Sequence, residues 1–289
     1  MLKKLFTLVC AVSALISSAA VTVQFIELKP GDEAAKKAYF ELPRNCRLWG
    51  TKGYNVSEKQ YNALLVMRND KVNFVFHFRG AMKEGAPRGV AVGMISPTHF
   101  NWYAGGFFDI YSGKKKLSSG KFSVKETKSG EAGIAVLDFS EGDFNGTVTL
   151  ALADNDDKVG FVFTPADKTL RYTVQLVAYP GEYGNPKLRK RVVYTNNGKA
   201  ENPKKLTPQD FYCVFGDEYY DIAQKRGRGC CAFLFNPKEI IPGSVIRSGY
   251  ACTAYLYFDK GTNASFVFWD FAGKSLAEAL EYMKNIQLQ

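Results

Sequence analysis

The stretch Asn62–Phe78, "NALLVMRNDKVNFVFHF", consists of an apolar run, a polar turn and a second apolar run built around Phe-Val-Phe. The same arrangement returns at residues 147–165, "TVTLALADNDDKVGFVFTP", and at residues 253–271, "TAYLYFDKGTNASFVFWDF". Two apolar runs joined by a short polar turn are typical of a β-hairpin. The copies are far apart and unevenly spaced, which indicates one hairpin type reused within a large antiparallel fold rather than a short tandem repeat.

Alternation along the Phe-Val-Phe segments predicts which side chains are buried. Successive side chains of a strand point to opposite faces, so the first phenylalanine of each copy lies on an apolar row. These residues are Phe74, Phe161 and Phe266, and in the first copy His77 and Arg79 lie on the opposite, more polar face. We therefore expect the three phenylalanines in the core.

Turn residues divide the rest of the chain into further short strands. We predict strands at about 90–95, 104–110, 121–125, 133–139, 170–179, 191–195, 230–235 and 244–251. Helix signals are few: Ser275 and Glu278 form a capping-box pattern before a C-terminal helix, and shorter helices are predicted near 31–40 and from Thr207. The pattern favours an all-β fold, a large antiparallel β-sandwich, with an extended or super-sandwich form as one option, a C-terminal α-helix and few short helices.

The N-terminus predicts export. Residues 1–20 combine Lys3 and Lys4, an apolar run and a small-residue end, as a secretory signal peptide does. An uncleaved membrane anchor is the alternative, although serines interrupt the run. With the signal removed we expect a soluble periplasmic or extracellular protein without a transmembrane segment. Residues 21–289 then form one composite β-sandwich unit, and the Pro-, Gly- and Lys-rich segment 180–206 is either an insertion or an internal break.

Charge and cysteine content limit the partners and the chemistry. The chain has a net charge of +10, and removal of the signal peptide takes away two lysines and no acid. Excess positive charge in an exported protein favours an anionic polymer as partner, and no motif indicates nucleic acid. Five cysteines remain, whose disulfide pairing the sequence leaves open: Cys46, Cys213, Cys230, Cys231 and Cys252. They form no CxxC pair, so no metal site is predicted, and no segment carries a cofactor motif, so no cofactor is predicted either.

The stretch Thr98–Tyr111, "THFNWYAGGFFDIY", is the first candidate site. Its aromatic residues alternate with His99, Asn101, Tyr103 and Asp109, which is how a glycan cleft combines flat rings with polar groups. Core packing is the alternative reading of the same pattern. The ligand-binding candidates on this interpretation are Tyr103, His99, Asn101, Asp109, Trp49 and Arg79.

Two further groups of residues complete the candidates. A basic patch is predicted from a run of cations that could pair with carboxylate or phosphate groups. Its residues are Lys187, Arg189, Lys190 and Arg191. The only histidines, His77 and His99, are the weak candidates for an acid–base catalyst. The acidic turn 154–157 lacks the spacing of a calcium loop and is interpreted as a solvated hairpin turn.

These observations favour an exported protein that binds carbohydrate or an anionic envelope or extracellular polymer, without catalysis. One alternative is a glycan-acting enzyme of the epimerase or lyase type, which would use a histidine as its acid–base group. The other alternative is a structural subunit of an extracellular assembly, whose aromatic surface would be a protein interface.

Overall fold

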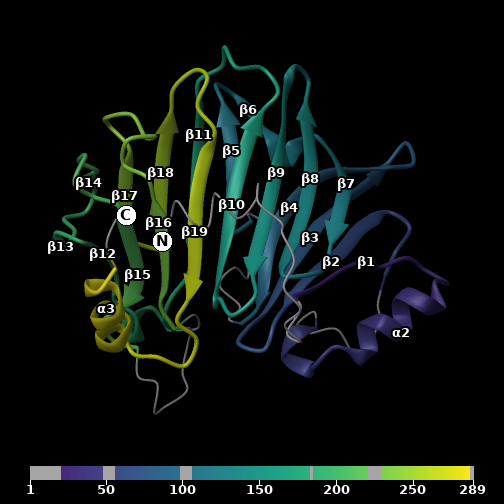
Figure 1. The fold of residues 1–289 in the computed structure, drawn as a ribbon, viewed down its shortest axis with the longest axis horizontal. Helices are drawn as coiled ribbons and strands as arrows, with labels where there is room; N and C mark the ends of the chain where they lie inside the picture. The colour runs from purple at the N-terminus through teal and green to yellow at the C-terminus, as the bar shows by residue number, and fades with distance from the viewer. Residues whose placement is uncertain (1–20, 48–55, 98–105, 183–184, 221–228, 287–289) are drawn as a thin grey trace.

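The computed structural model of the chain describes residues 21–47, 56–97, 106–182, 185–220 and 229–286. Within these residues nineteen strands pair in antiparallel ladders, which form two large sheets lying face to face (Figure 1). The predicted all-β sandwich with few helices is therefore confirmed.

The first sheet runs from β12 at one edge to β7 at the other. In pairing order its strands are β12 (Arg191–Thr195), β15 (Tyr212–Asp217), β16 (Cys231–Phe235), β19 (Ala264–Asp270), β10 (Lys158–Pro165), β9 (Phe144–Ala153), β8 (Ala132–Glu141) and β7 (Lys121–Lys128), with β13 (Gly198–Lys199) beside β12.

The second sheet runs from β14 at one edge to β1 at the other. In pairing order its strands are β14 (Lys204–Lys205), β17 (Val245–Arg247), β18 (Cys252–Phe258), β11 (Tyr172–Ala178), β5 (Phe108–Ser112), β4 (Ala86–Ser96), β3 (Asn73–Lys83), β2 (Gln60–Arg68) and β1 (Thr22–Glu27), with β6 (Lys115–Lys116) beside β5. Arg88 pairs with Lys121 between β4 and β7, and Val21, just before β1, pairs with Gly130 in the turn between β7 and β8; both pairings connect the two sheets.

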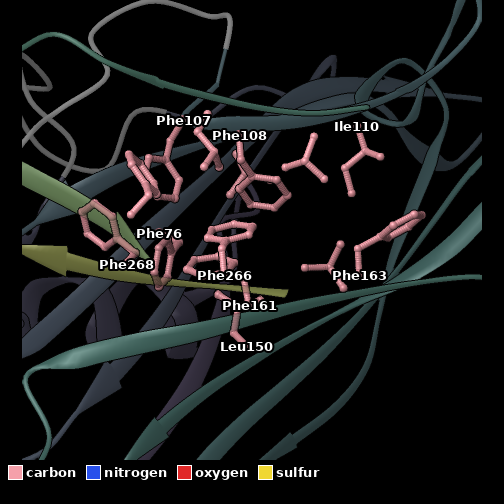
Figure 2. Packing of buried hydrophobic residues seen from close by; sticks show 14 of the residues in the cluster. Phe76, Phe107, Phe108, Ile110, Leu150, Phe161, Phe163, Phe266 and Phe268 are labelled. Atoms are coloured by element: carbon pink, nitrogen blue, oxygen red, sulfur yellow. The ribbon is translucent and has the colours of Figure 1, made fainter. Parts of the chain in front are cut away.

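Phenylalanines from both sheets fill the space between the layers (Figure 2). Phe74, Phe161 and Phe266 are at most 3% exposed, as the alternation predicted. The ring of Phe161 stacks on Phe266 at 4.7 Å and meets Phe76 of the opposite sheet edge-on at 5.7 Å. Burial of a large apolar side chain contributes about 1.5–3 kcal/mol, so this aromatic layer is a major source of stability.

Of the three predicted hairpins, two form as hairpins and the third does not. The stretches 62–78 and 147–165 become the paired strands β2–β3 and β9–β10. In the third stretch β18 pairs within the second sheet and β19 within the first, so the turn between them crosses from one layer to the other. Alternation indicates which face of a strand is buried but not which strand pairs with it. For this reason the prediction of a hairpin at residues 253–271 was wrong.

The two α-helices of the described residues lie at opposite ends of the molecule and cover the outer faces of different sheets (Figure 1). Helix α2 (Glu33–Glu41), close to the predicted 31–40, packs Tyr39 onto the outer side of β2 and β3. Helix α3 (Leu276–Lys284) packs Met283 onto the outer side of β15, β16 and β19. Short 3-10 turns complete the described helical segments: η1 (Arg44–Cys46), η2 (Leu117–Ser119) and η3 (Pro186–Leu188).

The helix predicted from Thr207 is absent from the described segment 206–211. Asp210 instead accepts hydrogen bonds from the Thr207 backbone N–H at 2.8 Å and from its hydroxyl at 2.9 Å, which closes a turn before β15. Side chains of Asp and Thr that bond nearby backbone groups compete with helix formation, and here the turn prevails.

Candidate functional site

The outer face of the second sheet, where β5, β11 and β18 lie side by side, presents polar and aromatic side chains. Phe108, Val174 and Leu256 point into the core from these strands. Register pairs Asp109 with Gln175 and Gln175 with Tyr255, so these three side chains form one row across the outer face. Half-exposed side chains and one exposed arginine form a cluster on this face, which we call the tyrosine platform; its members are Tyr111, Lys116, Gln175, Arg247 and Tyr255.

A chain of hydrogen bonds fixes the centre of the tyrosine platform. The Tyr111 hydroxyl donates to Gln175 Oε1 at 2.7 Å, and Gln175 Nε2 donates to the Tyr255 hydroxyl oxygen at 3.1 Å. Each bond fixes the orientation of the next side chain, because the Gln175 amide uses its acceptor on one tyrosine and its donor on the other. Among the described residues no acceptor is recorded for the Tyr255 hydroxyl proton, which is therefore able to donate to a ligand.

A cation lies against each ring of the tyrosine platform. Lys116 Nζ is 5.8 Å from the centre of the Tyr111 ring, and the Arg247 guanidinium is 5.2 Å from that of Tyr255. Contacts within about 6 Å are attractive because the ring face carries partial negative charge. Arg247 is exposed, and among the described residues no carboxylate forms an ion pair with it, so its guanidinium N–H groups can reach an external anion.

The buried side chain of Asp109 stabilises the tyrosine platform through its contact with Lys116. Its carboxylate is 4% exposed, pairs with Lys116 at 2.9 Å and accepts from the Ser118 hydroxyl at 2.6 Å. Burial opposes protonation of Lys116, but the bond to Asp109 prevails and the pKa of Lys116 is raised. Burial, together with the Asp109 charge, raises the pKa of the Tyr111 phenol, so that hydroxyl stays a hydrogen-bond donor. Asp109, one of the predicted ligand-binding residues, is therefore buried and bonds its neighbours Lys116 and Ser118.

His77 and Arg79 lie on the same outer face, nearer to α2. The neighbouring strand β4 pairs Gly93 with His77 and Ala91 with Arg79. His77 Nε2 is 3.0 Å from Asn62 Oδ1, a neutral amide, and Arg79 is exposed. The remaining predicted residues Trp49, His99, Asn101 and Tyr103 lie outside the described residues.

The predicted basic patch lies at the β12 edge of the first sheet, which we call the basic edge, and the structure gives its members different roles. Lys187 and Lys190 are exposed, and Lys190 pairs with Glu218 at 2.7 Å. Arg189 is 5.1 Å from the centre of the Tyr250 ring, which is 56% exposed. Cations and an aromatic ring therefore share this edge.

Arg191 is a structural residue of that edge rather than a surface cation. It is 6% exposed, and its guanidinium donates to three main-chain carbonyls, those of Pro180 at 2.7 Å, Glu182 at 3.4 Å and Tyr250. The charge is thus used to hold three separate chain segments together. Sequence alone could not separate Arg191 from Arg189, because it does not show that β12 turns residue 191 inward.

The acidic turn and the cysteines carry no metal site among the described residues. Lys158 neutralises Asp156 at 2.6 Å and Asp157 at 2.8 Å, and Asp157 also accepts from the Trp269 indole at 3.0 Å. All five described cysteines are buried free thiols. Burial raises the pKa values of Cys213 and Cys252, so these thiols stay protonated and poorly nucleophilic at neutral pH.

Most of the tyrosine platform was missed by sequence reasoning. The signal was present in "YTVQLVA" (172–178) and "CTAYLYF" (252–258), where polar or aromatic residues alternate with apolar ones. Periodicity placed Gln175 and Tyr255 on outer faces, but nothing in the sequence indicated that their strands are neighbours.

Comparison with known proteins does not assign the chain to a family. No protein-family model and no curated protein matches the chain. Among solved structures, the crystal structure of the GH36 α-galactosidase AgaB from Geobacillus stearothermophilus aligns with 75% of this chain and 40% of that chain, at 8% identity and a TM-score of 0.33. A likeness this distant supports no statement about activity. In the described part of the chain, neither helix is long and apolar enough to span a membrane.

Proposed function

We propose that this is an exported protein that binds an acidic glycan or similar anionic extracellular polymer on the tyrosine platform, without catalysing a reaction. The observation that supports binding is the chain Tyr111–Gln175–Tyr255 with a cation against each ring. Tyrosine rings give flat apolar contact to a sugar, and the amide and hydroxyl groups bond its hydroxyls. Export is proposed from the signal-like residues 1–20.

Arg247 and the basic edge favour an acidic ligand over a neutral one. A guanidinium can bond a carboxylate or sulfate through two parallel N–H groups, which gives both attraction and orientation. Lys116 is already paired with Asp109, so Arg247 is the cation of the tyrosine platform that can serve a ligand.

The glycan-acting alternative would need His77 or His99 as an acid–base group. His77 Nε2 lies 3.0 Å from the side-chain oxygen of Asn62, and His99 lies outside the described residues. The tyrosine platform, by contrast, needs no titrating group in order to bind, and this is why we propose binding.

The test is retention of the mature protein in gels that contain polygalacturonate, alginate or heparin. We expect Tyr255→Ala to weaken retention about tenfold, because it removes ring contact, a hydroxyl donor and the support of Arg247. Arg247→Gln should weaken binding to the acidic polymers while melting at the same temperature. The matched control is Tyr282→Ala, which removes a 47% exposed tyrosine from α3 on the other sheet. Equal retention of Tyr255→Ala and wild type would refute the proposal.

A further inference from the structure

The outer face of the first sheet has a second polar surface, formed where β7, β8 and β9 lie side by side. Register aligns Ser123 with Asp138 and Asp138 with Thr147 in one row. A parallel row aligns Lys121 with Ser140 and Ser140 with Asn145. We call these six side chains the polar dish: Lys121, Ser123, Asp138, Ser140, Asn145 and Thr147.

The residues between the two rows of the polar dish face the core. Phe122 and Phe139 are at most 5% exposed, and the third member of their row is Gly146. A Cβ at Gly146 would lie 2.2 Å from the Phe163 ring, so the core side of this row has no room for a side chain. The six polar side chains therefore share the outer face, with the backbone of the sheet as their floor.

The polar dish surrounds a hollow of about 490 Å³, which is bordered by Ala86 and Ala166. Ligand pockets in proteins are typically about 300–1,000 Å³. The hollow is therefore large enough for one or two sugar rings, and all six side chains of the polar dish border it.

Two side chains of the polar dish have bonding capacity that the protein does not use. Asp138 Oδ1 accepts from the Thr147 hydroxyl at 2.8 Å, which leaves further acceptor positions on its carboxylate. Asn145 Nδ2 reaches the Asp143 carbonyl only at 3.5 Å, and its Oδ1 is buried with no hydrogen-bond partner. The protein therefore holds the Asn145 side chain only weakly, and a small rotation would direct its amide toward a ligand in the hollow.

We propose that the polar dish is a second carbohydrate site, which takes a neutral pyranose residue through hydrogen bonds. Lys121 and Asp138 offset one another in charge, which favours a neutral ligand. Asp138 would accept from a pair of sugar hydroxyls, while the Asn145 amide and the neighbouring Ser and Thr hydroxyls would bond the others. The site goes beyond the proposed function, since the tyrosine platform lies on the other sheet and was assigned an acidic ligand.

Two sites on opposite outer faces would let one molecule hold two glycan chains. If both sites engage one polymer network, the second contact forms at a high effective concentration and retention exceeds that of either site alone.

The experiment is a titration of ¹⁵N-labelled mature protein with neutral hexasaccharides of the cello-, malto-, manno- and chito-series. We expect at least one of them to shift the amide signals of residues 121–123, 138–140 and 145–147. Asp138→Asn, which keeps the shape and removes the charge, should weaken that binding about tenfold or more. Asn145→Ala, near the start of the neighbouring strand β9, is an independent second variant.

The control variant is Tyr255→Ala, which should leave the response of the polar dish unchanged while weakening binding to the acidic polymer. Conversely, Asp138→Asn should retain the acidic polymer, so failure of one site is distinguishable from failure of the other. Absence of shifts in these three segments with all four sugars would overturn the proposal. Unchanged affinity in both Asp138→Asn and Asn145→Ala would overturn it as well.

Discussion

At the scale of single residues, the structure separates charges that serve the fold from charges that can serve a ligand. Arg191 and Arg247 are the same residue type, yet the first is 6% exposed and bonds carbonyls, while the second is exposed beside a tyrosine. Burial of an ionised group is costly unless every donor or acceptor is satisfied, so buried charges are those with surrounding partners. Asp210 is the clearest buried carboxylate of this kind.

Asp210 should make the protein sensitive to acid. Although its burial opposes ionisation, the bond to Lys204 at 2.8 Å and those to Thr207 lower its pKa to about 2. A lowered folded-state pKa stabilises the fold above the ordinary value of 3.8, and this stability is lost as pH falls toward about 2. We expect the melting temperature to decline over this interval, as measured by circular dichroism.

The Asp210→Asn variant tests that assignment. It should be less stable than wild type at pH 7, because Lys204 loses its partner, and the difference should narrow between pH 4 and pH 2. A difference that stays constant over this range would mean that Asp210 does not contribute to the acid sensitivity.

At the scale of elements, the C-terminal helix is the one whose local sequence specifies it best. Ser275 accepts from the Glu278 backbone N–H at 3.2 Å, and the Glu278 carboxylate accepts from the Ser275 backbone N–H at 2.7 Å. Both bonds of the predicted capping box are thus present. Bonds to Ser275 also lower the pKa of Glu278, so the box is formed at neutral pH.

Removal of the cap should loosen α3 without unfolding the sandwich. We expect Ser275→Ala to cost about 1 kcal/mol, as N-cap replacements do, measured by urea denaturation. The control is Glu281→Gln in the same helix, which breaks only an exposed pair with Lys284 and should change stability by less than about 0.5 kcal/mol. An equal loss in both variants would show that α3 is sensitive to charge rather than to capping.

At the scale of the whole molecule, cations and exposed aromatic rings lie together at the basic edge of the first sheet. Tyr219 and Tyr250 are the most exposed large apolar side chains described, and both lie at the basic edge with Lys190 and Arg189 against their rings. Such an edge attracts polyanions over a distance set by ionic strength, about 10 Å at 0.1 M salt.

Binding to an acidic polymer should therefore fall steeply between 0.1 M and 1 M salt. The double variant Lys187→Gln with Arg189→Gln should weaken retention on heparin and reduce its salt dependence. Lys125→Gln with Lys128→Gln removes the same charge from β7 and should have little effect, because those residues lie at the opposite edge of the first sheet. Retention that is unchanged at 1 M salt would exclude the basic edge as the main contact.

The sequence by itself determined the class of fold and which side chains of the strands are buried. Period-two alternation gave Phe74, Phe161 and Phe266 their place in the core, since the face that a side chain takes depends only on its position along a strand. It also specified the C-terminal helix, since the two residues of its capping box, Ser275 and Glu278, are only three positions apart in the sequence.

Only the tertiary structure decided which strands are neighbours, and with that the candidate sites. The third Phe-Val-Phe stretch became a crossing between layers, and the Tyr111, Gln175 and Tyr255 side chains met across strands far apart in the chain. The polar dish arises in the same way, from the register of β7, β8 and β9. Strand pairing is set by how whole apolar faces pack against one another, a non-local balance that the local pattern of any one strand does not contain.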